Sequence, residues 1–243
     1  MLLDLHAHSS GISHCCRIDA KENILRAKAA GLDGLVLTNH YTKPYVKDGD
    51  ALAFAHRYVD EYCAAKTAAD ELRMTLLFGI EVTMEKCGGA HLLVYGVDDR
   101  FVYEHAAMYD YTQKELWDAV KAAGGALVQA HPYRREVNAL LDTAMLDGVE
   151  VNCHPLYHYT HMDEMKEIAV KNNLTLTCGG DYHADTDRPI CGTYLPDAIG
   201  ESRRALADYL LTTEKIELCV HEPHTEKPVR VIYTRGAGIA IAK

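Results

Sequence analysis

Histidine and carboxylate side chains follow apolar runs along the whole of this chain. The first run leads into His6-Ala7-His8. A strand projects residues two positions apart from the same face, so both imidazoles could reach one metal ion. Asp181 and His183 repeat this spacing after two glycines, which let the backbone pack closely. Such nitrogen and oxygen donors suit zinc, manganese or iron. The candidate metal ligands are His6, His8, His14, His40, Glu81, His91, His131, Asp181 and His183.

These donors are numerous enough for more than one ion. One ion takes about four ligands, so the set could hold two or three ions. Glu81 is the carboxylate that could bridge two of them. Any one of the histidines could be an ordinary surface or core residue, but the whole set at successive strand ends indicates a metal site assembled from most of the chain.

Strands and helices are expected to alternate in the regions that carry these residues. This alternation predicts a parallel sheet, and about seven units predict a barrel with its chemistry at the carboxyl ends of the strands. A doubly wound sheet would place a site only at a topological switch point. The turn at Cys87-Gly88-Gly89 indicates a hairpin, and His91 lies just after it. The expected strands are 2–6, 35–38, 75–80, 91–97, 126–130, 148–152 and 174–178, and the expected helices are 20–30, 52–72, 114–123, 137–146, 162–171 and 201–211.

The composition narrows the class of protein. The 243 residues predict one domain over 1–243, with 214–243 as a possible C-terminal β extension in which 216–220 pairs with 229–233. A net charge of −10 argues against long nucleic acid, although metal ions could still attract small anions. No signal peptide or membrane span is recognisable, so a soluble cytoplasmic protein is expected. The eight cysteines lack a C-x-x-C pattern and are expected to be free thiols, of which Cys15, Cys16 and Cys153 neighbour candidate ligands.

The order of these motifs resembles the PHP (polymerase and histidinol phosphatase) superfamily over roughly residues 2 to 195. The resemblance implies an α/β fold, a distorted TIM-like (β/α)7 barrel holding up to three divalent ions. Asn39 departs from the aspartate more usual in the family before the histidine, which removes a negative charge near one ion. The motifs are His6-Ala7-His8-Ser9, Thr38-Asn39-His40, Gly79-Ile80-Glu81, His91-Leu92-Leu93, Ala130-His131-Pro132 and Gly180-Asp181-Tyr182-His183.

The resemblance also implies how the ligands divide among three ions. His14 is carried over only by its spacing after His8, in a loop where family members differ. The implied sets are His6, His8, Glu81 and Asp181 for the first ion, Glu81, His91 and His131 for the second, and His14, His40 and His183 for the third.

A cluster of two or three such ions predicts hydrolysis of a small phosphomonoester by a metal-bridging hydroxide, with Glu81, Asp181 and Arg134 as the catalytic set. An arginine fork fits two phosphoryl oxygens, so Arg134, Arg17 and Arg188 are candidates for binding the phosphate. His154, His158 and His161 follow strand 148–152 and could contact substrate. His158 is included in the substrate set, and His154, His158 or a metal-bound water could protonate the leaving group.

Two other functions stay open on sequence alone. One is a phosphodiesterase or nuclease acting on dinucleotides or short oligonucleotides. The other is a metal-binding module without catalysis, although a full ligand set argues against it. The expected partner is therefore a small phosphorylated metabolite or nucleotide, and nothing in the sequence fixes the oligomeric state.

Overall fold

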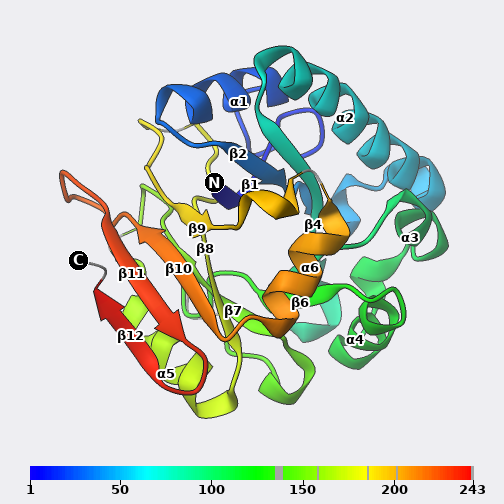
Figure 1. The fold of residues 1–243 in the computed structure, drawn as a ribbon. Coiled ribbons are helices and arrows are strands. Elements are labelled where there is room, and N and C mark those ends of the chain that lie inside the picture. The colour runs from blue at the N-terminus through cyan, green and yellow to red at the C-terminus, as the bar shows by residue number, and fades with distance from the viewer. Residues whose placement is uncertain (135–138, 158, 185, 201, 242–243) are drawn as a thin grey trace.

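The computed structural model describes residues 1–134, 139–157, 159–184, 186–200 and 202–241 (Figure 1). Its strands follow the order β12-β11-β10-β9-β1-β2-β4-β5-β6-β7-β8, with β3 paired to β4. The strands are β1 (Leu2–Ala7), β2 (Gly34–Leu37), β3 (His40–Tyr41), β4 (Thr75–Met84), β5 (Ala90–Tyr95), β6 (Ala126–Gln129), β7 (Gly148–Asn152), β8 (Thr175–Gly179), β9 (Gly192–Tyr194), β10 (Lys215–Val220), β11 (Val229–Thr234) and β12 (Gly238–Ile241).

The helices lie around the outside of this sheet, with α1 to α4 succeeding one another along one side (Figure 1). Their starts are fixed by side-chain caps. Asp50 accepts a hydrogen bond from the Ala53 amide at the start of α2, and Thr112 and Glu115 form a reciprocal capping box at the start of α4. The helices are α1 (Ala20–Ala29), α2 (Ala51–Leu72), α3 (Asp99–Glu104), α4 (Gln113–Ala122), α5 (Met162–Asn172) and α6 (Arg203–Thr212). Of the helices in the described ranges, none is long and apolar enough to cross a bilayer.

The sheet is mixed and curls on itself. β1, β2 and β4 are parallel, as are β6, β7 and β8, but β5 runs antiparallel to both β4 and β6. The curl brings the end of β8 beside β1, where the Asp181 amide donates to the His6 carbonyl at 2.8 Å. The α/β class is therefore confirmed. A regular (β/α)7 barrel is not confirmed, because the β4–β5 hairpin interrupts the alternation.

Two regions differ in detail from the sequence-based expectations. The helix expected over 137–146 begins outside the described residues, and 139–146 contain only a short 3-10 turn at Thr143–Met145. The C-terminal strands form the expected pair, with Ile216 opposite Tyr233, and β12 adds to it. These strands extend the same sheet, because β9 joins β10 to β1.

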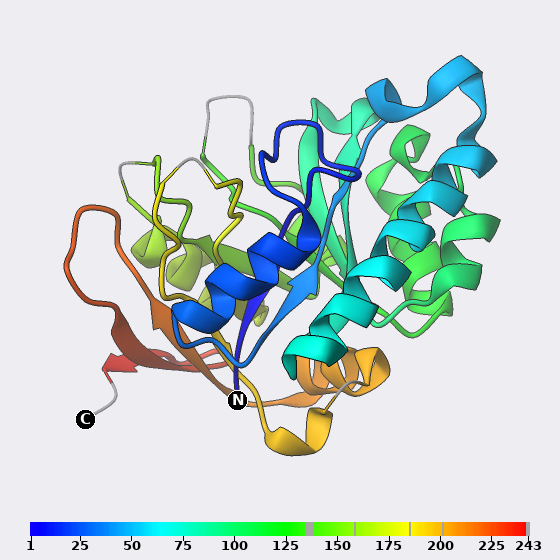
Figure 2. The same ribbon diagram turned by 90° about the horizontal axis from the view of Figure 1, so that it is seen from above.

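Strands and loops at one end of the sheet carry the candidate metal ligands. Figure 2 shows the long loop that follows β1 projecting from the end opposite the N-terminus. The core beneath these loops is formed by side chains of the central strands, including Leu3, Leu5 and Val36, all fully buried. The site is therefore built on rigid elements at its base and on loops at its mouth.

Candidate metal centre

Strand β1 supplies the first two imidazoles. His6 lies within the strand and His8 directly follows it, and both are completely buried. Their Nε2 atoms lie 3.4 and 3.0 Å from Oδ1 of Asp181, which follows β8. The spacing of two therefore brings both rings to the same carboxylate, as expected for residues on one face of a strand.

Glu81 is the centre of the cluster. Its Oε1 atom lies 3.3 Å from His6 Nε2, 2.7 Å from His91 Nδ1 and 3.0 Å from His131 Nε2. Its Oε2 atom faces the other side, 3.5 Å from His8 Nε2 and in contact with His40 Nδ1. Each oxygen thus faces a different group of imidazoles, which is the arrangement needed for a carboxylate that bridges two ions.

Glu81 lies within a strand and not at its end, where the sequence placed it. β4 continues to Met84, and Glu81 is paired with His40 on one side and Leu93 on the other. His91 reaches the cluster from the beginning of β5. Because β5 is antiparallel, its start lies at the same end of the sheet as the carboxyl ends of its parallel neighbours.

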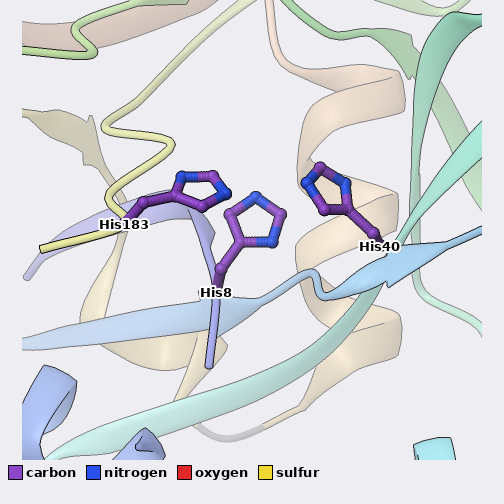
Figure 3. A group of neighbouring side chains, drawn as sticks. All are labelled: His8, His40 and His183. Atoms are coloured by element: carbon purple, nitrogen blue, oxygen red, sulfur yellow. The ribbon is translucent and has the colours of Figure 1, made fainter. Parts of the chain in front are cut away.

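A second group gathers beside Glu81, and it lacks His14. Figure 3 shows the ring of His8 between those of His40 and His183, and each outer ring centroid is 4.4 Å from that of His8. His14 instead is exposed and packs its ring on Tyr45, 4.1 Å away. Among the described residues, the groups close enough to share an ion are His8, His40 and His183; His6, Glu81 and His131; His6, His8 and Asp181; His40, Glu81 and His91; and His154, Asp181 and His183.

Cys15, the neighbour of His14, is exposed and lies near the same two imidazoles. The Cys15 thiol interacts with both His40 and His183. Burial opposes ionisation of the thiol, but hydrogen bonds to His183 and His40 lower the pKa of Cys15 to about 5. A thiolate is a good ligand for zinc.

The backbone around the ligands is unusually constrained. His131 and Asp181 have positive φ values of 31° and 47°, a region that residues other than glycine rarely occupy. A Cβ atom at Gly179 would lie 2.5 Å from Cβ of His6, so only glycine allows β8 to approach β1 this closely. Strain of this kind persists where the surrounding structure enforces it, commonly at functional sites.

Hydrogen bonds on the far side of three rings fix which nitrogen faces the cluster. His6 Nδ1 contacts Glu150 Oε1 at 2.9 Å, and His183 Nδ1 donates to the Asp181 carbonyl at 2.7 Å. His8 Nδ1 contacts Ser13 Oγ at 3.0 Å, and this hydroxyl donates to Asn39 Oδ1. Metal-binding histidines typically use their second nitrogen in this way, which leaves Nε2 available to the ion.

The carboxylates are ionised in the absence of bound ions. Burial favours a neutral carboxyl group, but neighbouring positive charges outweigh it. His40 contributes most to holding the pKa of Glu81 well below its usual value, and His6 and Arg134 do the same for the pKa of Asp181. The centre is therefore a buried concentration of negative charge surrounded by imidazoles.

The imidazoles of the centre differ in the direction in which their pKa values are shifted. Burial lowers the pKa of His40, but the carboxylate of Glu81 raises it to about 10. Burial, together with the nearby charges of His183 and His40, holds the pKa of His8 well below its usual value. Without ions the cluster thus retains protons on some rings, and cations would have to displace them.

The centre is chemically suited to cations. Imidazole and carboxylate donors match zinc, manganese and iron. Among the described residues, five buried candidate-ligand atoms face one another without forming a well-oriented hydrogen bond, which is costly unless an ion satisfies them. These atoms are Nε2 of His6, Nε2 of His8, Nδ1 of His40, Oε2 of Glu81 and Oδ1 of Asp181.

The three candidate arginines have different surroundings. Arg134 lies beside the centre, with Nη1 bonded to Asp181 Oδ2. Arg188 instead forms a buried ion pair with Asp4, its side chain only 2% exposed, which leaves it unsuited to binding substrate. Arg17 is exposed, although its backbone amide donates to the His183 carbonyl. His158 lies outside the described residues.

Glu150 was not among the residues predicted from the sequence, and His154, predicted as a substrate contact or proton donor, lies within reach of the metal centre. Glu150 is buried within β7, where it also accepts hydrogen bonds from the His131 amide and from Asn152 Nδ2. A carboxylate in a fully buried strand was the signal available. His154 is buried and close enough to Asp181 and His183 to share an ion with them, a role that its position after a strand end alone did not indicate.

Comparison with known proteins supports the fold. The chain matches no protein-family model, and no curated protein matches its sequence. A two-domain protein from Bacteroides vulgatus, described as containing a PHP-like metal-dependent phosphoesterase, matches 96% of this chain and 75% of its own at a TM-score of 0.65 and 17% identity. A protein from Bifidobacterium adolescentis, described as a metal-dependent phosphoesterase, matches 77% and 90% at a TM-score of 0.53 and 18% identity.

A further similar structure is described as an amidohydrolase. This Chromobacterium violaceum protein matches 81% of the present chain and 92% of its own at a TM-score of 0.52 and 17% identity. At such identities the likeness concerns the fold. One fold can serve different reactions, so the function must be argued from the residues of the site.

Proposed function

We propose that this chain is a metal-dependent phosphoesterase of the PHP superfamily that hydrolyses small phosphomonoesters. The observation that carries the proposal is Glu81, whose two oxygens face separate groups of imidazoles in a buried centre. The likeness to structures described as metal-dependent phosphoesterases agrees with it.

The centre would hold two to three divalent ions, with zinc, manganese or iron as the candidates. His6, His8, Glu81 and Asp181 would ligate the first ion, and Glu81, His91 and His131 the second. His40 and His183, together with Cys15, would ligate the third. Ions held in this way lower the pKa of bound water toward ~7 and neutralise charge on a phosphoryl group.

The protein's own side chains would orient the substrate. Arg134 is 16% exposed and lies at the edge of the centre, where its guanidinium could bind phosphoryl oxygens. Its contact with Asp181 keeps it in place before substrate arrives. The net charge of −10 argues against long nucleic acid, so a small phosphorylated metabolite or nucleotide is the proposed partner.

The test is a panel of phosphomonoesters and phosphodiesters assayed with manganese or zinc, with metal content measured on the same samples. We expect phosphate release from monoesters and two to three ions per chain. Glu81→Ala should abolish hydrolysis and release more than one ion, whereas Glu85→Ala, on the adjacent turn, should retain both properties. Preferential cleavage of diesters would favour the nuclease function, and a fully loaded protein inactive on all esters would contradict the proposal.

A further inference from the structure

A cavity of about 130 Å³ opens beside the metal centre. Its lining includes His131 and Arg134, which lie at the metal centre, and Tyr159 and His161 of the loop that follows β7. Its walls are rich in aromatic rings, which the chemistry at the ions does not require. The described residues that line it are His131, Pro132, Tyr133, Arg134, Asn152, Tyr157, Tyr159, Thr160 and His161.

Contacts between side chains connect this cavity to the centre. Tyr157 contacts His154, with ring centroids 4.4 Å apart and the rings tilted by 45°, and it also contacts Arg134, whose Cζ is 4.1 Å from the tyrosine ring centroid. His154 in turn belongs to the group that includes Asp181. Arg134 therefore contacts both the Asp181 carboxylate, through Nη1, and the ring of Tyr157.

The outer wall exposes aromatic surface at the mouth. Tyr159 is 56% exposed and Tyr133 is 43% exposed, although large aromatic side chains usually bury most of their area. The ring of Tyr159 lies 4.4 Å from that of His161 at an angle of 62°. Hydrogen bonds anchor the loop that carries Tyr159, because the amide and the hydroxyl of Thr160 both donate to the Glu222 carboxylate.

The size of the cavity limits what it can accept. About 130 Å³ is close to the ~150 Å³ of a protein cavity that takes one benzene molecule. Planar rings gain from offset or edge-on contacts with tyrosine, whereas a saturated ring of the same size gains only burial.

We propose that this cavity binds the leaving group of the ester and selects one that carries a single planar ring. This inference rests on the proposed phosphomonoesterase function. The phosphoryl group would contact Arg134 at the ions, and the ring would contact Tyr157 and Tyr159. Tyr159 is then a residue that determines specificity.

The experiment compares 2-phenylethyl phosphate with 2-cyclohexylethyl phosphate in the metal-loaded protein. The two leaving groups have similar basicity and size and differ in planarity. We expect kcat/KM to favour the phenyl compound about 10-fold, the equivalent of one aromatic contact. Tyr159→Leu should bring this ratio close to one, whereas Tyr103→Leu, on α3, should leave it unchanged.

The outcomes separate the two proposals. Equal turnover of both esters would overturn the cavity assignment and leave the phosphatase function intact, as would a ratio that survives Tyr159→Leu. If neither ester is hydrolysed, the phosphatase function fails. In that case calorimetry with 2-phenylethylphosphonate and its cyclohexyl analogue tests the cavity assignment without turnover. Tighter binding of the phenyl compound that is lost in Tyr159→Leu would support the assignment. Equal binding of the two compounds would overturn it.

Discussion

The carboxylate of Glu150 contacts Nδ1 of His6 at 2.9 Å, on the side of the ring opposite the metal centre. Its other oxygen accepts hydrogen bonds from the His131 amide and from Asn152. A single buried carboxylate thus holds the proton of His6 on Nδ1 and fixes the backbone of a second candidate ligand.

Glu150→Gln should weaken metal binding although it preserves the size of the side chain. Two donors face Oε2, so the oxygen of a glutamine would stay there and its amide nitrogen would face His6. His6 Nδ1 would then have to accept, and the ring proton would move to Nε2, the ligand atom. We expect the affinity of one ion to fall about 10- to 100-fold, measured by competition with a chelator. Glu167→Gln, exposed on α5, is the control, and unchanged affinity in Glu150→Gln would contradict this role.

The strand-borne ligands could be predicted because a strand has a fixed period. His6 and His8 need only extended backbone near the end of β1 to point in one direction. Asp181 and His183 follow β8 instead, and Asp181 reaches the centre with a positive φ of 47°. The curled sheet then brings the ends of β1 and β8 together. His91 could be included as a donor, but its position depended on the antiparallel direction of β5.

Ligands carried by loops could not be predicted in the same way, because a loop has no period. The segment after His8 gave no basis for choosing between His14 and Cys15, and the structure turns His14 outward onto Tyr45. Arg188 shows a different limit. Its sequence position is equally compatible with binding substrate and with the buried ion pair that it forms with Asp4.

Cys15→Ser should therefore affect metal content more than His14→Ala. Hydrogen bonds to His183 and His40 lower the pKa of the thiol to about 5, so it is ionised at neutral pH. A serine hydroxyl cannot supply the same charge. We expect Cys15→Ser to lose the third ion under mild chelation while His14→Ala keeps it, as shown by elemental analysis. Cys63→Ser, an exposed thiol on α2, controls for loss of a cysteine. The opposite ranking of the two variants would restore His14 as the ligand.

Arg134→Ala should slow hydrolysis with little loss of metal. Removing a charged hydrogen bond to the phosphoryl group costs ~2–3 kcal/mol, so kcat/KM should fall about 30- to 150-fold. Arg17→Ala, which removes an exposed side chain, should change it far less. An unchanged rate in Arg134→Ala and a lowered rate in Arg17→Ala would move phosphate recognition to Arg17.

Metal binding should release protons, and the affinity should rise with pH. The pKa of His40 is about 10 without ions, because Glu81 outweighs the effect of burial, so His40 carries a proton throughout the neutral range. An incoming cation must displace that proton, so metal affinity should rise as the pH is raised toward 10. For each proton displaced, the affinity should rise by ~10-fold per pH unit. Cys15, already ionised, adds nothing to this release at pH 7.5.

Calorimetric titrations in two buffers of different ionisation enthalpy count the protons released when metal binds. We expect at least one at pH 7.5, fewer in His40→Ala and an unchanged number in His56→Ala, which alters an exposed histidine on α2. Binding without proton release would show that His40 is neutral before the ion arrives.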